Sequence, residues 1–213
     1  MPPAGPKGMG AGFKLALSPS HTAMLPDYSP DAIDVQIAEL LVATADQSDE
    51  ALDERVGATL RLLREKLGMD VVFVSRFAEG RRTILKEDHA PGADVLAAGH
   101  SDPLEESWCQ RVVDGRLPEL VVDAAPYIAD GTVPAPPFAI GTHLSTPLPD
   151  AQGRPMGTLC CFSFKRRAGA NLSDVKRLRL AAQMLADRLA PPQGPTADEM
   201  QLQPMEPRPS QRH

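Results

Sequence analysis

The sequence has few cysteines, no long apolar run and no excess of basic residues, and each absence excludes a class of protein. Three cysteines, Cys109, Cys160 and Cys161, are an odd number with two adjacent members, which does not make a disulfide framework. No apolar run reaches the roughly 18 residues that a transmembrane helix needs. The first thirty residues contain only the short apolar patch LALS, which is too short for a secretory signal. We therefore expect a reduced, cytoplasmic protein.

The charge of the chain argues against nucleic-acid binding. The formal net charge is −6, whereas a nucleic-acid binder normally presents a basic face. Basic residues cluster only at Arg81-Arg82 and at 165–167, beside predicted turns, and both clusters are interpreted as solvated loop ends. We expect neither a nucleic acid nor a membrane as a partner.

The length and the composition of the ends predict one folded domain between two tails. The chain has 213 residues, of which 42% are hydrophobic, enough for one substantial core with extensions. Residues 1–28 and 191–213 are rich in proline, glycine and polar residues, so we expect flexible tails there. Residues 29–190 then form a single domain, and no internal repeat is evident.

Three amphipathic helices are expected, two before any strand and one at the end of the domain. The first is capped by Ser29, and its apolar stripe is Ile33, Ile37, Leu40 and Leu41. The second follows Ser48 and ends at Gly68, and its apolar face is Leu52, Val56, Leu60, Leu63 and Leu67. The last is capped by Ser173. Its 3-4-3-4 spacing of Val175, Leu178, Ala182, Leu185 and Leu189 is typical of a seam for a partner helix.

Between these helices the pattern predicts an antiparallel sheet. Residues 70–78 and 81–87 are expected to form a hairpin across Glu79-Gly80, residues 117–124 a strand, and residues 140–148 and 155–164 a second hairpin. A short helix within 101–115 is expected to start at Asp102 and Pro103 and to end at Gly115. The fold class is α+β: a sheet of about five or six strands, with the terminal helices on one face and the short helix and loops on the other.

Four segments together resemble the GAF domain of bacterial sensory proteins, over roughly residues 45–190. They are LREKLGMDVVFVSRF, LEESWCQRVVDGRLPELVVDA, IGTHLSTPLPDAQGRPMGTLCCFS and SDVKRLRLAAQMLADRL. The most specific piece is the last hairpin, with a Pro-Leu strand end, then Asp-x-x-Gly, then Gly-Thr-Leu. The resemblance implies a GAF-like fold and a stand-alone sensory or regulatory module.

The resemblance also implies a small-molecule pocket on the sheet face opposite the terminal helices, and signalling through those helices. The expected ligand-binding residues are Phe73, Ser75, Phe77, Trp108, Cys109, Tyr127, Ile128, Phe138, His143 and Ser145. The expected partners are a small-molecule ligand of unknown identity, a second copy of the chain bound through the terminal helices, and a signalling protein. No cofactor is specified.

The thiols and histidines give no clear sign of catalysis or metal binding. Cys160 and Cys161, adjacent in a strand, point to opposite sides of the sheet, and we interpret them as buried apolar residues. Cys109 is expected in the middle of the short helix, where no helix dipole lowers its pKa, with a packing or pocket-lining role. His89, His100 and His143 lack the spacing of metal ligands.

Two alternatives stay open. The first is an enzyme similar to the GAF-type free methionine-(R)-sulfoxide reductases, which need an attacking thiolate and resolving cysteines within reach of one another. Those enzymes carry a Gly-Val-Cys-Gly type segment where this chain has EESWCQRV, and this departure argues against catalysis. Phytochrome-like relatives attach a bilin covalently and need a Cys-His pair beside it, whereas Gln110 follows Cys109 here, so this attachment is not expected. The second alternative is a ligandless interaction scaffold, which a collapsed pocket favours over a roomy one.

Overall fold

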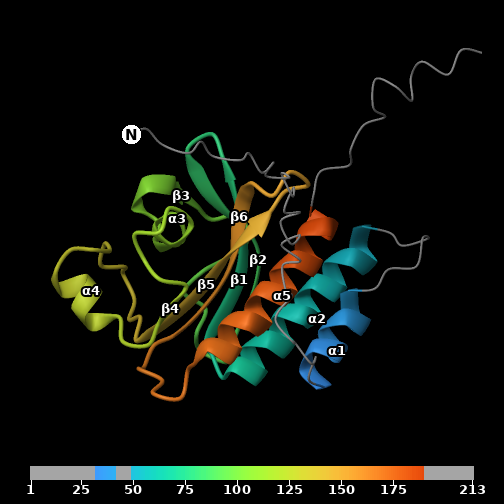
Figure 1. The fold of residues 1–213 in the computed structure, drawn as a ribbon, viewed down its shortest axis with the longest axis horizontal. Helices are drawn as coiled ribbons and strands as arrows, with labels where there is room; N and C mark the ends of the chain where they lie inside the picture. The colour runs from blue at the N-terminus through green and yellow to red at the C-terminus, as the bar shows by residue number, and fades with distance from the viewer. Residues whose placement is uncertain (1–31, 42–48, 190–213) are drawn as a thin grey trace, which may run out of the picture.

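The computed structural model describes residues 32–41 and 49–189, and both tails expected from the sequence, together with the expected Ser29 cap, lie outside them (Figure 1). Six antiparallel strands form one sheet in the order β3-β2-β1-β6-β5-β4. The strands are β1 (Val71–Ala78), β2 (Arg81–His89), β3 (Ser101–Pro103), β4 (Leu120–Val121), β5 (Thr142–Pro149) and β6 (Pro155–Ser163). The helices are α1 (Ala32–Leu41), α2 (Asp49–Leu67), α3 (Trp108–Val113), α4 (Ala125–Ala129) and α5 (Leu172–Leu189). The α+β prediction with one antiparallel sheet is confirmed.

Both hairpins form where turn residues predict them. Glu79 and Gly80 connect β1 to β2 with φ angles of 51° and 70°, the left-handed pair that a two-residue hairpin turn requires. Between β5 and β6, Asp150 accepts hydrogen bonds from the backbone N–H groups of Gln152 and Arg154 at 2.9 and 2.8 Å. These turns fix the register of the two pairs that make up most of the sheet.

The glycine of the Gly-Thr-Leu segment is required by the packing of β6 against β1. A Cβ atom at Gly157 would lie 1.9 Å from the carbonyl oxygen of Ser75, which is far closer than atoms can approach. Only glycine therefore allows the two central strands to pair at this point.

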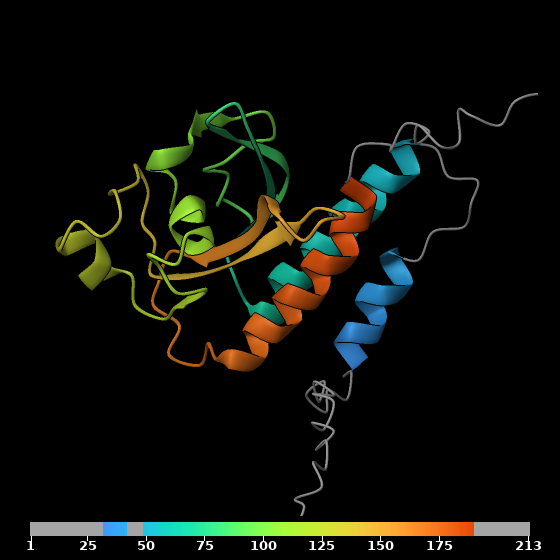
Figure 2. The same ribbon diagram turned by 45° about the horizontal axis from the view of Figure 1, so that its top comes forward.

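Helices α2 and α5 cover one face of the sheet, and α1 lies outside them, on the side away from the strands (Figure 2). The core between them joins apolar side chains from β1, β5 and β6 to those of the helices; it includes Val72, Val74, Leu144, Leu159, Leu60, Leu63, Leu178 and Leu185. On α5, Val175, Leu178, Ala182 and Leu185 are all buried in this core. The interpretation of their spacing as a seam for a partner helix is therefore wrong: the chain's own sheet and helices fill it. Dimerisation through the terminal helices stays a prediction, and it would have to use a face of these helices that is not buried in this core.

The predicted short helix starts too early. Residues Ser101–Pro103 pair with β2 as the edge strand β3, a 3-10 turn follows at Leu104–Glu106, and α3 begins only at Trp108. Its cap is Ser107, whose hydroxyl accepts a hydrogen bond from the backbone N–H of Gln110 at 3.1 Å. Asp102 precedes a proline, which disfavours helical backbone there, and its carboxylate pairs with Arg82 on β2.

Two further boundaries differ from the predicted ones. The cap of α5 is Asn171 instead of Ser173, because the Asn171 side chain accepts from the Ser173 N–H at 2.8 Å while Asp174 accepts from the Asn171 N–H at 3.0 Å. The strand predicted over 117–124 shrinks to β4, and the helix α4 forms in the proline-rich segment that follows. No helix in the described part of the chain is long and apolar enough to cross a membrane.

Candidate ligand-binding site

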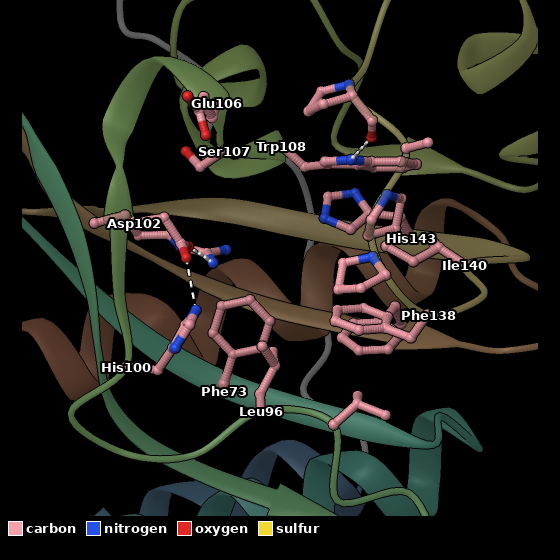
Figure 3. A pocket seen from close by; sticks show the side chains of 17 residues that line it. Phe73, Leu96, His100, Asp102, Glu106, Ser107, Trp108, Phe138, Ile140 and His143 are labelled. Atoms are coloured by element: carbon pink, nitrogen blue, oxygen red, sulfur yellow. Dashed lines mark hydrogen bonds and ion pairs between the residues drawn. The ribbon is translucent and has the colours of Figure 1, made fainter.

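A cavity of about 310 Å³ lies on the sheet face opposite α2 and α5. Its floor comes from β1, β2, β5 and β6, and its cover comes from α3 and the loops 95–100 and 134–140 (Figure 3). Figure 3 shows Asp102 and His100 at one side of the cavity, with the Phe73 ring next to them, and Trp108, His143 and Phe138 at the other side. A cavity of this size, with an apolar surface and a few convergent polar groups, has the features of a small-molecule site.

The charged wall is organised around Arg82 on β2. Its guanidinium forms an ion pair with Asp102 on β3, and the His100 Nε2 atom lies 2.6 Å from the other Asp102 oxygen. The Arg82 side chain is only 12% exposed, and its Cζ atom lies 5.6 Å from the centre of the Phe73 ring. These contacts hold one cation at the cavity surface.

The opposite wall is built from aromatic rings locked by their neighbours. Trp108, the first residue of α3, donates from Nε1 to the carbonyl oxygen of Pro134 at 3.0 Å. Its ring lies 5.2 Å from the ring of His143 on β5. Phe138 stacks on Phe162 of β6 with ring centres 5.3 Å apart. A flat apolar group in the cavity would find a preformed surface here.

His143 presents a buried polar atom to this aromatic wall. Its side chain is 2% exposed, and its Nδ1 atom has no hydrogen-bond partner among the described residues. Burial, and secondarily the charge of Arg82, lower the pKa of His143 to about 3. The imidazole is therefore neutral at physiological pH, and its Nδ1 atom is buried without a hydrogen-bond partner among the described residues.

A cluster of thiols and hydroxyls lies beside the cavity. The Sγ atoms of Cys109 on α3 and Cys160 on β6 are 3.1 Å apart. Ser145 Oγ lies 2.7 Å and Thr158 Oγ1 lies 3.2 Å from the Cys160 sulfur. One Arg82 nitrogen lies 3.6 Å from the Cys109 sulfur, so Arg82 connects this cluster to the cavity.

The two contacting thiols have pKa values shifted in opposite directions. The hydrogen bond from Cys160, with help from Arg82, lowers the pKa of Cys109 to about 6 against the opposing effect of burial. Burial raises the pKa of Cys160 well above its usual value. The predicted mid-helix position of Cys109 is wrong, since it is the second residue of α3 and lies in the first turn.

Cys161 has a different environment. It faces α2 and α5 in the helix-covered core, where burial raises its pKa. The prediction that Cys160 and Cys161 point to opposite sides of the sheet is confirmed. Among residues 32–41 and 49–189, no group of three or more His, Cys, Asp or Glu side chains is placed to hold a metal ion.

A family model described as the GAF domain matches residues 49–190, more than half of the chain. This chain belongs to the GAF domain family. GAF domains are generally small-molecule-binding sensory modules. No curated protein matches the sequence.

Solved structures of other GAF proteins share the fold at low identity. The GAF domain of an Acinetobacter phosphoenolpyruvate-protein phosphotransferase has a TM-score of 0.55 and 14% identity, over 73% of this chain and 91% of that one. The phycocyanobilin-bound GAF domain of a cyanobacterial phytochrome has a TM-score of 0.56 and 15% identity, over 76% of this chain and 96% of that one. A free methionine-R-sulfoxide reductase from Neisseria meningitidis, solved with its substrate, has a TM-score of 0.56 and 20% identity, over 73% of this chain and 85% of that one.

Of the ten ligand-binding residues predicted for this GAF domain, four line the cavity: Phe73, Trp108, Phe138 and His143. Ser75, Cys109 and Ser145 belong instead to the buried cluster of thiols and hydroxyls beside it. Tyr127 and Ile128 of α4 pack in the apolar cluster that contains Trp108, and Phe77 packs near Phe73; none of these three reaches the cavity surface. Ligand contact by any of the ten stays a prediction.

The charged wall of the GAF domain was missed. The interpretation of Arg82 as part of a solvated loop end is wrong, because its side chain is largely buried between Asp102 and Phe73. Strand alternation contains the signal: Arg82 is two residues before Ile84, which is buried on the cavity side of the sheet. Asp102 is not predicted at the cavity because its segment is expected to be helical, and His100, which directly precedes that segment, is considered only as a metal ligand.

Proposed function

We propose that this GAF domain is a sensory or regulatory module that binds a small organic molecule in the cavity between Arg82 and Trp108. The observation that carries the proposal is the cavity itself: about 310 Å³, with a charged wall, an aromatic wall and the unpartnered His143 Nδ1. This volume is at the lower end of the range for ligand sites, so the ligand is a small metabolite. A ligandless scaffold with a self-filled pocket is disfavoured by the same volume.

The chemistry of the walls describes the ligand. A flat or ring-shaped apolar part would lie against Trp108 and Phe138. A polar atom would meet the neutral His143, and a polar or charged end would meet the Arg82–Asp102 pair. Ligands that combine these features gain both apolar burial and satisfied hydrogen bonds.

The signal would pass through the sheet to α5. On β5, His143 faces the cavity while the next residue, Leu144, is buried in the core beneath α5. A ligand that displaces β5 therefore changes the packing of α5, which a partner reads. A second copy of the chain and a separate signalling protein are the proposed partners, and the cytoplasm is the proposed location.

A blocking variant with a matched control tests ligand binding. Leu96→Trp places a large ring at the cavity wall, whereas Leu172→Trp places the same ring on α5, where Leu172 is 73% exposed. In a thermal-shift screen of metabolites, we expect at least one compound to raise the melting temperature of the wild type and of Leu172→Trp but not of Leu96→Trp. A screen in which no compound stabilises the wild type, or in which Leu96→Trp responds equally, contradicts the proposal.

A second candidate function is reduction of a small sulfoxide, which the contact between Cys109 and Cys160 beside the cavity favours. A fold neighbour is a free methionine-R-sulfoxide reductase. If this chain has that activity, wild type and Cys161→Ser reduce free methionine sulfoxide with dithiothreitol, and Cys109→Ser does not. Absence of turnover in the wild type rejects this candidate and leaves the sensory proposal intact.

A further inference from the structure

We propose that Cys109 and Cys160 are a redox-modification site beside the cavity: hydrogen peroxide joins them in a disulfide, and Arg82 then loses its sulfur partner, so the charged wall becomes more positive. The proposal goes beyond ligand binding and does not depend on which molecule the cavity holds. It requires neither sulfoxide turnover nor a metal.

The geometry favours this bond and excludes other pairings. The two sulfur atoms are 3.1 Å apart, and a disulfide has a length of roughly 2.0 Å, so a movement of roughly 1 Å closes it. Cys109 comes from α3 and Cys160 from β6, two elements 51 residues apart in the sequence that the fold brings together. Cys161, although adjacent to Cys160, is buried among the side chains of α2 and α5 on the other face of the sheet.

The surroundings of the pair assign different roles to the two sulfurs. The Cys160 thiol from β6 and Arg82 from β2 both face the Cys109 sulfur, and the Cys160 hydrogen bond first, then Arg82 and Thr158, lower the pKa of Cys109 to about 6 against the opposing effect of burial. Burial raises the pKa of Cys160, which therefore keeps its proton. At neutral pH Cys109 is a thiolate and attacks the oxidant, and Cys160 is the resolving thiol.

Peroxide reaches the pair through the cavity. Both sulfurs are fully buried, but the side chain that touches Cys109, that of Arg82, itself lines the cavity and is 12% exposed. Hydrogen peroxide is close to water in size, so a cavity of about 310 Å³ admits it. A small displacement of Arg82 opens the way to the Cys109 sulfur.

The reaction consumes one peroxide and yields two waters. The Cys109 thiolate attacks one peroxide oxygen, the O–O bond breaks, and the departing hydroxide takes a solvent proton to become water, which leaves a sulfenic acid. Cys160 then transfers its proton to the sulfenic hydroxyl and attacks the Cys109 sulfur, so that the S–S bond forms and a second water departs. The two sulfurs lose two electrons in total, and a low-molecular-weight thiol restores the pair.

The disulfide changes the electrostatics of the cavity. In the reduced protein, Arg82 lies between two negative partners, the Cys109 sulfur and Asp102. The disulfide carries no charge, so only Asp102 remains, and the wall gains one positive charge relative to the reduced state. An anion in the cavity is then bound more tightly than before.

Peptide mapping after peroxide treatment of the folded protein tests the bond. We expect a peptide linking Cys109 to Cys160 that dithiothreitol removes. Trypsin leaves Cys160 and Cys161 on one peptide, so variants are needed to assign the linked cysteine. The matched control Cys161→Ser must still form the disulfide. Cys160→Ser must not form it, and its Cys109 sulfenic acid should be trapped by dimedone. A wild-type protein that forms no linked peptide, or forms it through Cys161, overturns the proposal without affecting ligand binding.

The single tryptophan, Trp108, reports the charge of the wall. Its fluorescence is quenched by iodide, which is an anion, and by acrylamide, which is neutral, and the ratio of the two quenching constants is independent of the fluorescence lifetime. One added positive charge within several ångströms raises this ratio by about twofold at low salt. We expect that rise on oxidation of the wild type and its absence in Cys109→Ser, which carries no charge at this position before or after treatment. An unchanged ratio in a protein that has formed the disulfide overturns the electrostatic part of the proposal.

Discussion

Acid should destabilise this protein through His143, and replacement of that side chain should remove the effect. Burial first, and the nearby Arg82 charge second, lower the pKa of His143 from 6.5 to about 3. Glutamine at this position keeps a neutral polar side chain in place of an ionisable one. We therefore compare the wild type with His143→Gln at about pH 7.5 and about pH 5.

The sign and size follow from proton linkage. Above pH 6.5 His143 is neutral in both the folded and the unfolded chain, so it makes no difference to stability there. Between pH 6.5 and about 3 only the unfolded chain binds the proton, which favours unfolding. At pH 5 the unfolded state gains RT ln(1 + 10^1.5), about 2 kcal/mol, and the wild type loses that amount of unfolding free energy.

Urea unfolding at the two pH values measures the effect. The lowered pKa of Cys109 also makes stability fall as the pH drops from 9 through about 6, but this contribution is present in both proteins and cancels in the comparison. The matched control is His100→Gln, because the His100 side chain is 53% exposed. The expected loss between the two pH values is about 2 kcal/mol smaller in His143→Gln than in the wild type or in the control. Equal losses in all three proteins would refute the reasoning.

Two further substitutions test the sheet and the thiol cluster. Gly157→Ala puts a methyl group against the Ser75 carbonyl oxygen and should lower the free energy of unfolding, measured in urea, by at least about 2 kcal/mol. The control Gly169→Ala, whose Cβ meets no described atom within 4 Å, should change this free energy little, and equal effects of the two substitutions would contradict the argument. Arg82→Met removes the cation beside Cys109 and should raise the pKa of this thiol by about one unit only, because the Cys160 hydrogen bond remains. The ultraviolet absorbance of the thiolate, followed against pH, measures this pKa, and an unchanged titration would show that Arg82 does not act on the Cys109 sulfur.

The sequence predicts the fold well because the fold depends on local patterns. The apolar positions of α2 recur at helical spacing, and Val56, Leu60, Leu63 and Leu67 are all buried as expected. Glu79-Gly80 supplies the two left-handed residues that the first hairpin needs. Each of these features is encoded within a few neighbouring residues, so no knowledge of tertiary contacts is required.

The charged wall depends instead on a contact between distant segments. The alternation with Ile84 indicates which face of the strand Arg82 is on, but it does not indicate burial, since Arg81 is exposed and a turn precedes both residues. Burial arises because Ser101–Pro103 joins the sheet beside β2 and brings Asp102 to the Arg82 guanidinium. The capping pattern of that segment favours a helix, and the strand pairing prevails over it.

The same boundary error misplaces Cys109 within its helix. A helix that starts at Asp102 puts Cys109 in its second turn, whereas a helix that starts after Ser107 puts it in the first turn.

From the first turn Cys109 meets Cys160 on β6, whose sequence neighbour, Cys161, is packed beneath α5. On β5 the same alternation joins His143 in the cavity to Leu144 in the helix-covered core. Because protein cores are close-packed, a shift of either strand that accommodates a ligand or a disulfide must also move the side chains of α5. One sheet would therefore couple both proposed inputs, small-molecule binding and thiol oxidation, to α5, the proposed output helix.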